Sequence, residues 1–244
     1  MPSRVISVTT PDGCMDCYMA GPDTSVPVVV FFMDGFGYRR TLTDMADRLA
    51  VKVRVVLPNL YYRHGPIPPV DIAAAIKPGP EQARMMEYYQ SLTPALVLSD
   101  LDALLRSPSC AAAAEQGVGC LGYCMGGAFA VAAAGALPNR VVAAASVHGG
   151  GLVTGTPDSP DRRIADIKGY LYLAFAGVDP YFSAEQAQTL ASKTYAAGLN
   201  CLIETYSGAH HGFAVADVPA YNAGAAQRHW RRIESVFNEA FSLQ

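Results

Sequence analysis

Short apolar runs alternate with helix-forming segments along most of this chain, and this alternation limits the possible fold more than any other feature of the sequence. Strands are predicted over 27–33, 52–60, 117–122, 141–147, 169–177 and 200–208. Helices are predicted over 42–50, 80–92, 93–107, 125–137, 183–198 and 221–241. Because strands that alternate with helices run parallel through right-handed crossovers, the sequence predicts an α/β fold with a mostly parallel central sheet and helices on both faces.

Two parts of the chain depart from this alternation. Residues 4–10 and 14–20 are strand-like and are joined by a Pro-Asp-Gly turn, so an N-terminal antiparallel hairpin is predicted. Residues 61–80 carry five prolines and no clean period, which predicts a loop. With 244 residues and 51% hydrophobic content, the chain is expected to form a single domain over 1–244.

Charge and hydropathy argue against several classes of partner. The net charge is −3, and no basic stripe indicates nucleic-acid binding. The purely apolar stretches, such as 28–33, are far shorter than the ~20 residues that span a bilayer, and the first residues lack the apolar core of a signal peptide. We therefore expect a cytoplasmic protein that acts on a small molecule without membrane or nucleic acid, as a monomer or homodimer.

Two motif-like patterns do not indicate a cofactor or a metal. Cys14 and Cys17 form a C-x-x-C pattern, but residues three apart in a strand point to opposite faces, so they cannot share a metal ion or a disulfide. Residues 117–122 spell G-x-G-x-x-G, but these glycines lie inside the predicted strand, and the acidic residue of a dinucleotide site is missing downstream. We expect no cofactor and no metal.

The segment Gly122-Tyr123-Cys124-Met125-Gly126 carries the strongest chemical signal. It is a G-x-C-x-G pattern between a strand and a helix, which is the nucleophile-elbow pattern with a thiol in place of the usual hydroxyl. The glycines permit the tight turn, and the helix N-terminus favours a negative charge on sulfur. The Met125 N–H is a candidate oxyanion donor. The alternative interpretation is a small buried cysteine in a glycine-rich turn.

A nucleophile of this kind needs a base and an acid, and both types of residue follow later strands. Asp179 comes just after the strand at 169–177, and His210 and His211 come just after the strand at 200–208. The order nucleophile, acid, histidine is that of α/β-hydrolases. The pattern predicts a Cys-His-Asp triad, and either histidine fits the position of the base.

These motifs resemble the dienelactone hydrolase family of α/β-hydrolases, the carboxymethylenebutenolidases and their relatives. The matching segments are "GYCMGG", "GVDPYFS", "GAHHGFAV", "FFMDGFG", "LPNLYYRHGP" and "PAYNAGAAQRHWRR". The resemblance implies an α/β-hydrolase fold and a hydrolase that cleaves a small ester or lactone through a thioester acyl-enzyme. It implies Cys124 as nucleophile, Asp179 as acid and His211 as base, since His211 matches the family's H-G-F.

The sequence departs from the family at two positions. Where the family has a glutamate that contacts the resting cysteine, this chain has Asp34, shorter by about 1.5 Å. We expect Asp34 near the Cys124 sulfur, where it acts on the protonation of the thiol, and the N–H of Gly35 as a second oxyanion donor. Where dienelactone-cleaving members have an arginine for the substrate carboxylate, this chain has Val215.

The remaining candidates concern substrate binding. Residues 61–91 are expected to fold over the site, with Tyr61, Tyr88 and Arg84 facing the substrate, and Tyr123 beside the nucleophile is a fourth candidate. Aromatic walls with few charges favour a small, uncharged ester or lactone. Three alternatives remain open: an acyl transferase or thioesterase that uses the same triad, a binding protein that keeps the fold without turnover, and a redox thiol protein centred on Cys124.

Overall fold

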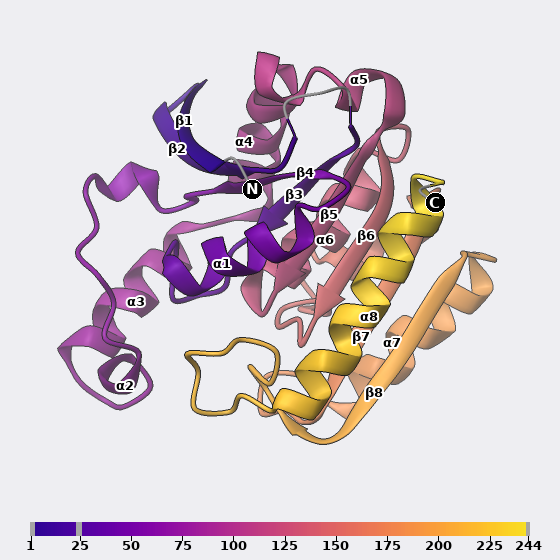
Figure 1. Ribbon diagram of the computed structural model, residues 1–244. Helices are drawn as coiled ribbons and strands as arrows, with labels where there is room; N and C mark the ends of the chain where they lie inside the picture. The colour runs from indigo at the N-terminus through magenta and orange to yellow at the C-terminus, as the bar shows by residue number, and fades with distance from the viewer. Residues whose placement is uncertain (1–2, 23–25, 243–244) are drawn as a thin grey trace.

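The computed structural model describes residues 3–22 and 26–242 and shows an eight-stranded sheet in the order β1-β2-β4-β3-β5-β6-β7-β8 (Figure 1). The strands are β1 Ser3–Thr10, β2 Gly13–Ala20, β3 Val28–Phe32, β4 Arg54–Pro58, β5 Val118–Tyr123, β6 Val141–Val147, β7 Tyr170–Val178 and β8 Cys201–His210. Strands β3 to β8 pair in parallel, whereas β1, β2 and β4 pair antiparallel at one end. The predicted mostly parallel sheet with an N-terminal hairpin is confirmed.

Helices cover both faces of this sheet (Figure 1). Helices α1 and α8 pack against one face, over β4 and over β6 and β7, and α4 and α6 pack against the other. The longer helices are α1 Arg40–Leu49, α3 Pro80–Ser91, α4 Pro94–Arg106, α6 Met125–Ala136, α7 Ala184–Ala196 and α8 Ala223–Ala240. None of the helices in the described ranges is both long enough and apolar enough to cross a bilayer.

The central strands are buried on both faces, which is why their sequences are apolar without alternation. Every residue of β3, β4 and β5 is buried. Helix α6 lies directly on β3, β5 and β6, and its small alanine and glycine side chains allow this close approach. The strand that precedes Cys124 and the helix that follows it are therefore both fixed in the core.

The hairpin places its two cysteines as the sequence predicts. Cys14 is exposed and Cys17 is buried, because they lie on opposite faces of β2. The two thiols therefore cannot form a common redox or metal site.

The segment predicted as a loop over 61–80 contains two short helices. These are η1 Tyr62–His64 and α2 Ile72–Ala75, and the Asp71 side chain caps α2 by accepting a hydrogen bond from the Ala74 N–H at 3.1 Å. The cap at Asp71 therefore favours the helix α2, which the proline-rich composition of this segment did not predict. Packing in this part is sparse: α2 buries only Ala75, and α3 buries only Met85.

Candidate active site

Cys124 lies at the junction of β5 and α6 with a backbone conformation that non-glycine residues rarely adopt. Its φ and ψ are 53° and −119°. Such strain costs on the order of 1–3 kcal/mol and persists where the surrounding structure enforces it. Here the Cys124 N–H donates to the Val147 carbonyl at 3.1 Å, and the Cys124 carbonyl accepts from the Gly150 N–H at 3.2 Å. The cysteine is therefore held at the carboxyl edge of the sheet by the end of β6.

The two glycines that flank Cys124 are required by close backbone contacts. A Cβ atom at Gly122 would lie 1.9 Å from the Gly126 carbonyl oxygen. A Cβ atom at Gly126 would lie 2.4 Å from the Phe32 carbonyl oxygen. Both distances are far below van der Waals contact, so any larger residue would push α6 away from β3 and β5. This supplies the physical reason for the G-x-C-x-G pattern.

The two predicted oxyanion donors lie on neighbouring segments beside Cys124. Met125 begins α6, where backbone N–H groups have no intrahelical acceptor. Gly35 lies in the turn after β3, which closes with a hydrogen bond from the Gly37 N–H to the Asp34 carbonyl at 3.0 Å. Tyr61 connects the two segments, since its hydroxyl donates to the Gly35 carbonyl at 3.0 Å and lies 3.8 Å from the Met125 sulfur. Tyr61 is buried and so supports these segments from within.

The predicted acid and base are in direct contact. The Nδ1–H of His211 donates to Asp179 Oδ2 at 2.8 Å, and the second carboxylate oxygen of Asp179 accepts from the Tyr181 N–H at 2.9 Å. Both side chains are largely buried. His210, in contrast, is exposed at the end of β8, where it pairs with Val178. The geometry therefore distinguishes the two histidines that residue spacing alone could not.

The other ring nitrogen of His211 is left for Cys124. Nε2 is buried and has no hydrogen-bond partner among the described residues. Burial lowers the pKa of His211, but the hydrogen bond to Asp179 and the interaction with Cys124 outweigh it and raise the pKa to about 10. The site therefore stabilises a protonated His211, which is the state that follows removal of a proton from a thiol.

Asp34 is held by an arginine. Both oxygens of its carboxylate are bound by Arg39, Oδ1 at 2.6 Å and Oδ2 at 2.8 Å, and Oδ1 also accepts from the Phe36 N–H. Arg39 binds Asp217 as well, at 2.7 Å, which ties the turn after β3 to the segment that follows His211. Among the described residues Asp34 makes no hydrogen bond to the Cys124 thiol, so its direct action on the sulfur stays a prediction. The Arg39 guanidinium thus binds both oxygens of the Asp34 carboxylate in a bidentate pair.

Arg84 is already paired within α3. Its guanidinium donates to Glu81 at 2.6 and 3.0 Å and to the Pro68 carbonyl at 3.4 Å, and it lies over the Tyr88 ring. Tyr88 packs against Tyr61, with ring centroids 5.4 Å apart. These contacts leave Arg84 neutralised by its own helix, so it is not a free cation that waits for a substrate carboxylate.

Tyr123 and Val215 are both buried away from any substrate. The Tyr123 hydroxyl donates to His229 Nε2 at 2.9 Å, beneath the sheet edge against α8. The expectation that Tyr123 contacts substrate is therefore wrong, because neighbouring residues of a strand point to opposite faces and Cys124 follows it at the turn. Val215 is fully buried and belongs to the core.

Three residues near the triad were not among the predicted site residues. Tyr89 on α3 lies against the turn after β3, since a Cβ atom at Gly35 would be 3.9 Å from its ring, and burial and then Cys124 raise the pKa of Tyr89. The exposed Tyr181 contacts the His211 ring, with centroids 4.8 Å apart. His148, directly after β6, contacts the same ring at 5.0 Å. The available signal for His148 was its place at the carboxyl end of a predicted strand.

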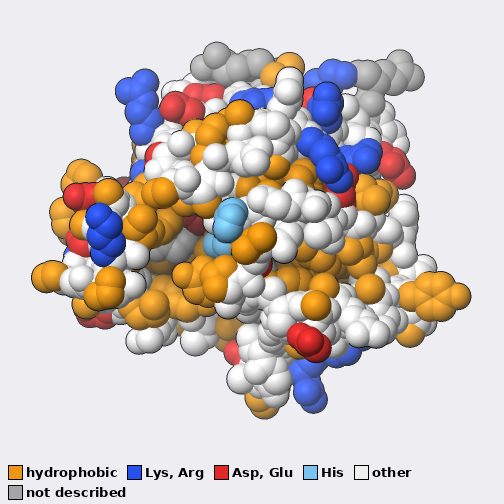
Figure 2. All heavy atoms as spheres, turned by 90° about the horizontal axis from the view of Figure 1, so that it is seen from below, with side chains coloured by type: hydrophobic (Ala, Val, Ile, Leu, Met, Phe, Trp, Pro, Cys, Tyr) orange, Lys and Arg blue, Asp and Glu red, His pale blue; other side chains and the backbone are white. Residues whose placement is uncertain are grey.

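Viewed from the carboxyl edge of the sheet, the surface is hollowed between the lobe formed by α2 and α3 and the rest of the molecule (Figure 2). Hydrophobic side chains border this hollow, and histidine side chains are visible beside it. Among the exposed apolar residues are Met86 and Tyr89 on α3 and Tyr181 after β7. The hollow therefore gives an apolar approach to the catalytic edge.

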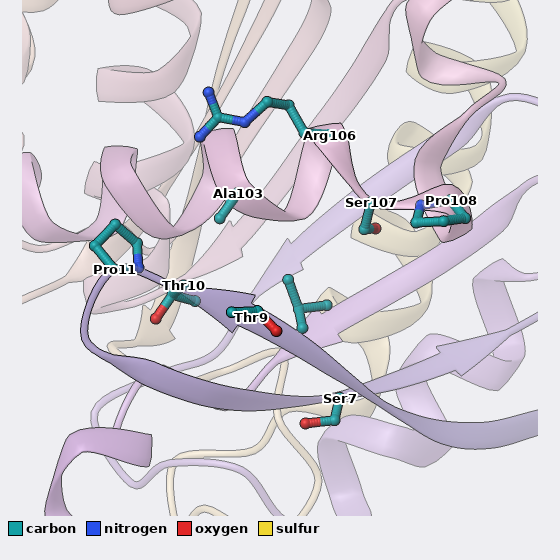
Figure 3. Close-up of a pocket in the computed structure, with 9 residues that line it drawn as sticks. Ser7, Thr9, Thr10, Pro11, Ala103, Arg106, Ser107 and Pro108 are labelled. Atoms are coloured by element: carbon teal, nitrogen blue, oxygen red, sulfur yellow. The ribbon is translucent and has the colours of Figure 1, made fainter.

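A second hollow of about 500 Å³ lies between the end of β1 and α4 (Figure 3). It is lined by Ser7, Val8, Thr9, Thr10, Pro11, Ala103, Arg106, Ser107 and Pro108. None of these residues belongs to the triad or its neighbouring turns. Arg106 is paired with Asp102 at 2.7 Å, so the hollow offers no unpaired charge from this arginine. In the described ranges, no three His, Cys, Asp or Glu side chains are grouped as a metal site.

The sequence matches a known family of proteins. The dienelactone hydrolase family matches the chain over residues 15–241. A Synechocystis sp. protein named "Putative carboxymethylenebutenolidase" is 30% identical over 232 residues, which cover 90% of this chain and 89% of that protein. A carboxymethylenebutenolidase of Rhodococcus opacus is 28% identical over 229 residues, which cover 92% of this chain and 86% of that protein.

Solved structures confirm the architecture. A Klebsiella pneumoniae protein described as "Putative Dienelactone Hydrolase" superposes with a TM-score of 0.81 at 20% identity, and the match covers 98% of both chains. At this identity the likeness concerns the fold. It confirms the predicted α/β-hydrolase fold, with a parallel sheet, two helical layers and an N-terminal hairpin.

Proposed function

Because this chain belongs to the dienelactone hydrolase family and is thereby a hydrolase of ester or lactone bonds, we propose that it cleaves small, uncharged esters or lactones through Cys124, His211 and Asp179. The observation that carries the proposal is the 2.8 Å hydrogen bond between His211 and Asp179, which directs the free Nε2 of a buried imidazole to the nucleophile elbow. This is the arrangement that nucleophilic catalysis requires.

In the first half of the reaction, His211 Nε2 takes the thiol proton of Cys124 and the sulfur attacks the substrate carbonyl carbon. The carbonyl oxygen becomes an oxyanion, which the N–H groups of Met125 and Gly35 hold. The C–O bond to the leaving group then breaks, and the His211 imidazolium gives its proton to the departing alkoxide. A thioester between Cys124 and the acyl group remains. In a lactone, the released hydroxyl stays attached to that acyl group.

In the second half, His211 takes a proton from water and the resulting hydroxide attacks the thioester carbon. The C–S bond breaks, the acid product leaves, and the proton on His211 returns to the sulfur of Cys124. Asp179 holds the Nδ1–H of the imidazole throughout, so that Nε2 always faces the reacting atoms.

The preference for uncharged substrates rests on how the nearby arginines are paired. Arg84 is bound by Glu81, and Arg39 is bound by Asp34 and Asp217. Each guanidinium would have to leave a carboxylate before it could bind one on a substrate. Charge-assisted contacts of that kind are worth about 1.5–3 kcal/mol each, so their loss removes the main reason to select an anion.

The proposal is tested with matched ester pairs. We expect p-nitrophenyl butyrate to be cleaved with a kcat/KM at least equal to that of p-nitrophenyl hemisuccinate, which has a similar length and adds one carboxylate. Dihydrocoumarin tests lactone cleavage in the same assay. Mass spectrometry after a rapid quench is expected to show an acyl group on the peptide that contains Cys124. A strong preference for the hemisuccinate, or turnover that survives in Cys124→Ala, would contradict the proposal.

A further inference from the structure

Two features of His148 each cost free energy of folding. Its backbone has a φ of +39°, which non-glycine residues rarely adopt, and its side chain is buried with neither Nδ1 nor Nε2 bonded to any described residue. A buried polar group without a partner costs about 1–3 kcal/mol, and a residue at positive φ costs on the same order. Costs of this kind gather at functional sites, so the surroundings of His148 indicate what the residue contributes.

The backbone around His148 is part of the support of the nucleophile. The His148 N–H donates to the Ala174 carbonyl of β7 at 2.8 Å. Its neighbours Val147 and Gly150 make the two hydrogen bonds to the Cys124 backbone described above. The turn at His148 thus faces Cys124 on one side and β7, which ends before Asp179, on the other.

The ring of His148 is enclosed by three aromatic or imidazole rings. It lies 5.8 Å from Tyr123, 5.0 Å from His211 and 5.4 Å from Phe213, centroid to centroid. The contact with His211 is edge to face, at an interplanar angle of 62°. His148 therefore fills the space between the strand of the nucleophile and the segment of the base, and it forms a buried wall for the His211 ring.

Two of the rings that enclose His148 are themselves held in place by other residues. Tyr123 donates its hydroxyl proton to His229 Nε2, because the opposite nitrogen of His229 donates to the Ala226 carbonyl at 2.5 Å. Phe213 stacks on Tyr206 with centroids 4.6 Å apart. Among the rings that enclose His148, Tyr123 is therefore held from α8 and Phe213 from β8.

We propose that His148 is a positioning residue for the proposed base: its buried ring holds the His211 imidazole in line with Asp179 and Cys124, and its unbonded nitrogen atoms respond to the charge that His211 gains and loses. Since no partner fixes the tautomer of His148, the ring can turn a lone pair toward His211 when His211 is protonated. The inference rests on the proposed function, because it assigns His148 a role through His211.

The charged and titratable groups around His148 determine its own protonation. They are Tyr123 from β5, His211 from the segment after β8, and His229 from α8, with Arg48 of α1 acting on the last. Burial, then His211 and His229, lower the pKa of His148 well below its usual range, and burial lowers the pKa of His229 to about 3. His211 is thus the member of this histidine cluster whose protonated form the site stabilises.

The test compares His148→Phe, which keeps a ring and removes both nitrogens, with His148→Asn, which keeps a polar group and tolerates positive φ. His210→Phe is the matched control, since His210 is exposed and lies outside the cluster. NMR of 15N-labelled histidines follows the titration of His211 without any substrate, and p-nitrophenyl butyrate hydrolysis separates kcat from KM.

We expect His148→Phe to lower the titration midpoint of His211 by at least about 0.5 pH unit and to lower kcat about tenfold, as for a misplaced catalytic group, with KM within twofold. His148→Asn should keep the His211 titration midpoint and kcat close to those of the wild type, and His210→Phe should change neither the midpoint nor kcat. An unchanged His211 titration in both His148 variants would overturn the inference. If His148→Phe does not fold, His148→Ala, which also removes both nitrogen atoms, takes its place under the same criterion. Because the titration needs no turnover, a chain inactive on every ester would refute the proposed function and still leave this test decisive.

Discussion

The proposed catalytic edge of the sheet, around Cys124, Asp179 and His211, and the α2–α3 segment, residues 66–92, face the same hollow but are built in opposite ways. At the catalytic edge, Cys124 is fixed by two backbone hydrogen bonds, and Asp179 and His211 are largely buried. In the α2–α3 segment, only Ala75 and Met85 are buried within the helices. The first region has almost no room for movement, whereas the second is attached to the core by few contacts.

This contrast indicates a division of work between the two regions. Reacting groups must be held within fractions of an ångström, which requires buried and fully bonded support. Substrate selection tolerates change, and such residues commonly lie on loosely packed segments over a rigid scaffold. Substitutions at the catalytic edge should therefore change kcat, and substitutions in the α2–α3 segment should change KM and selectivity. The predictions below test that division.

The largest effect is expected from Cys124→Ala. Removal of the nucleophile should lower kcat at least ~10³-fold, because no other group can form the thioester. The melting temperature should change little, since the elbow is set by Gly122 and Gly126. Cys14→Ala, at an exposed thiol, is the control and should keep full activity. Steady-state hydrolysis of p-nitrophenyl butyrate measures both variants.

Thiol labelling provides an independent check on the same residue. Burial raises the pKa of Cys110 and Cys201 to about 11 and that of Cys120 to about 12, so these thiols should react slowly with iodoacetamide at pH 7. Cys124 should be labelled first. Equal labelling of Cys124 and the exposed Cys14 would argue against an activated nucleophile.

The next effect concerns the two adjacent histidines. His211→Ala should lower kcat at least ~10²-fold, in the range of positioned acid–base catalysis. His210→Ala should cost less than about threefold, since His210 is exposed and does not contact Asp179. A reversed pair of results would mean that His210 moves into the site during turnover.

The protonation of His211 should also be visible in stability. Its pKa is raised from 6.5 to about 10 in the folded state, so the unfolded chain loses this proton at a lower pH. The stabilisation is fully present below about pH 6.5 and is lost as the pH rises through 10. Urea unfolding of wild type and His211→Gln at pH 6 and pH 10 measures it. The difference between the two proteins should be larger at pH 6 by on the order of 1–3 kcal/mol.

Asp34 should contribute mainly to the stability of the fold and little to kcat. Asp34→Asn removes a carboxylate that binds Arg39 on both oxygens and leaves Arg39 with Asp217. We expect destabilisation of about 1–3 kcal/mol in urea, with kcat reduced less than about tenfold. Asp179→Asn is the matched variant and should reduce kcat far more. Equal losses of kcat in the two variants would return Asp34 to a direct role at Cys124.

The smallest effect is expected in the α2–α3 segment. Arg84→Ala breaks a solvent-accessible pair with Glu81 on the same helix, and such pairs contribute little to stability. The kcat/KM ratio of p-nitrophenyl hemisuccinate to p-nitrophenyl butyrate should change less than about threefold. A selective loss of hemisuccinate hydrolysis would show that Arg84 leaves Glu81 to bind substrate, and the division of work between the two regions would then extend to charge recognition.

The sequence by itself determined the architecture and the position of the proposed nucleophile. Continuous apolar runs in β3, β4 and β5 require burial on both faces, which only a helix-covered parallel sheet supplies. The glycines around Cys124 are local requirements of a tight turn, and local requirements can be read along the chain. The order of Asp179 and the histidines after later strands follows from the same topology.

Only the tertiary structure decided which side chains meet at the edge of the sheet. Asp34 binds Arg39 because the turn after β3 bends its carboxylate toward a guanidinium five residues later and toward Asp217, which is distant in sequence. His148 contacts His211 because the segments that follow β6 and β8, two strands separated by β7 in the sheet, come together at its carboxyl edge. Contacts between distant segments depend on backbone direction and rotamers at the ends of strands. The chain folds to satisfy all of these at once, so the pattern of any one segment could not predict them.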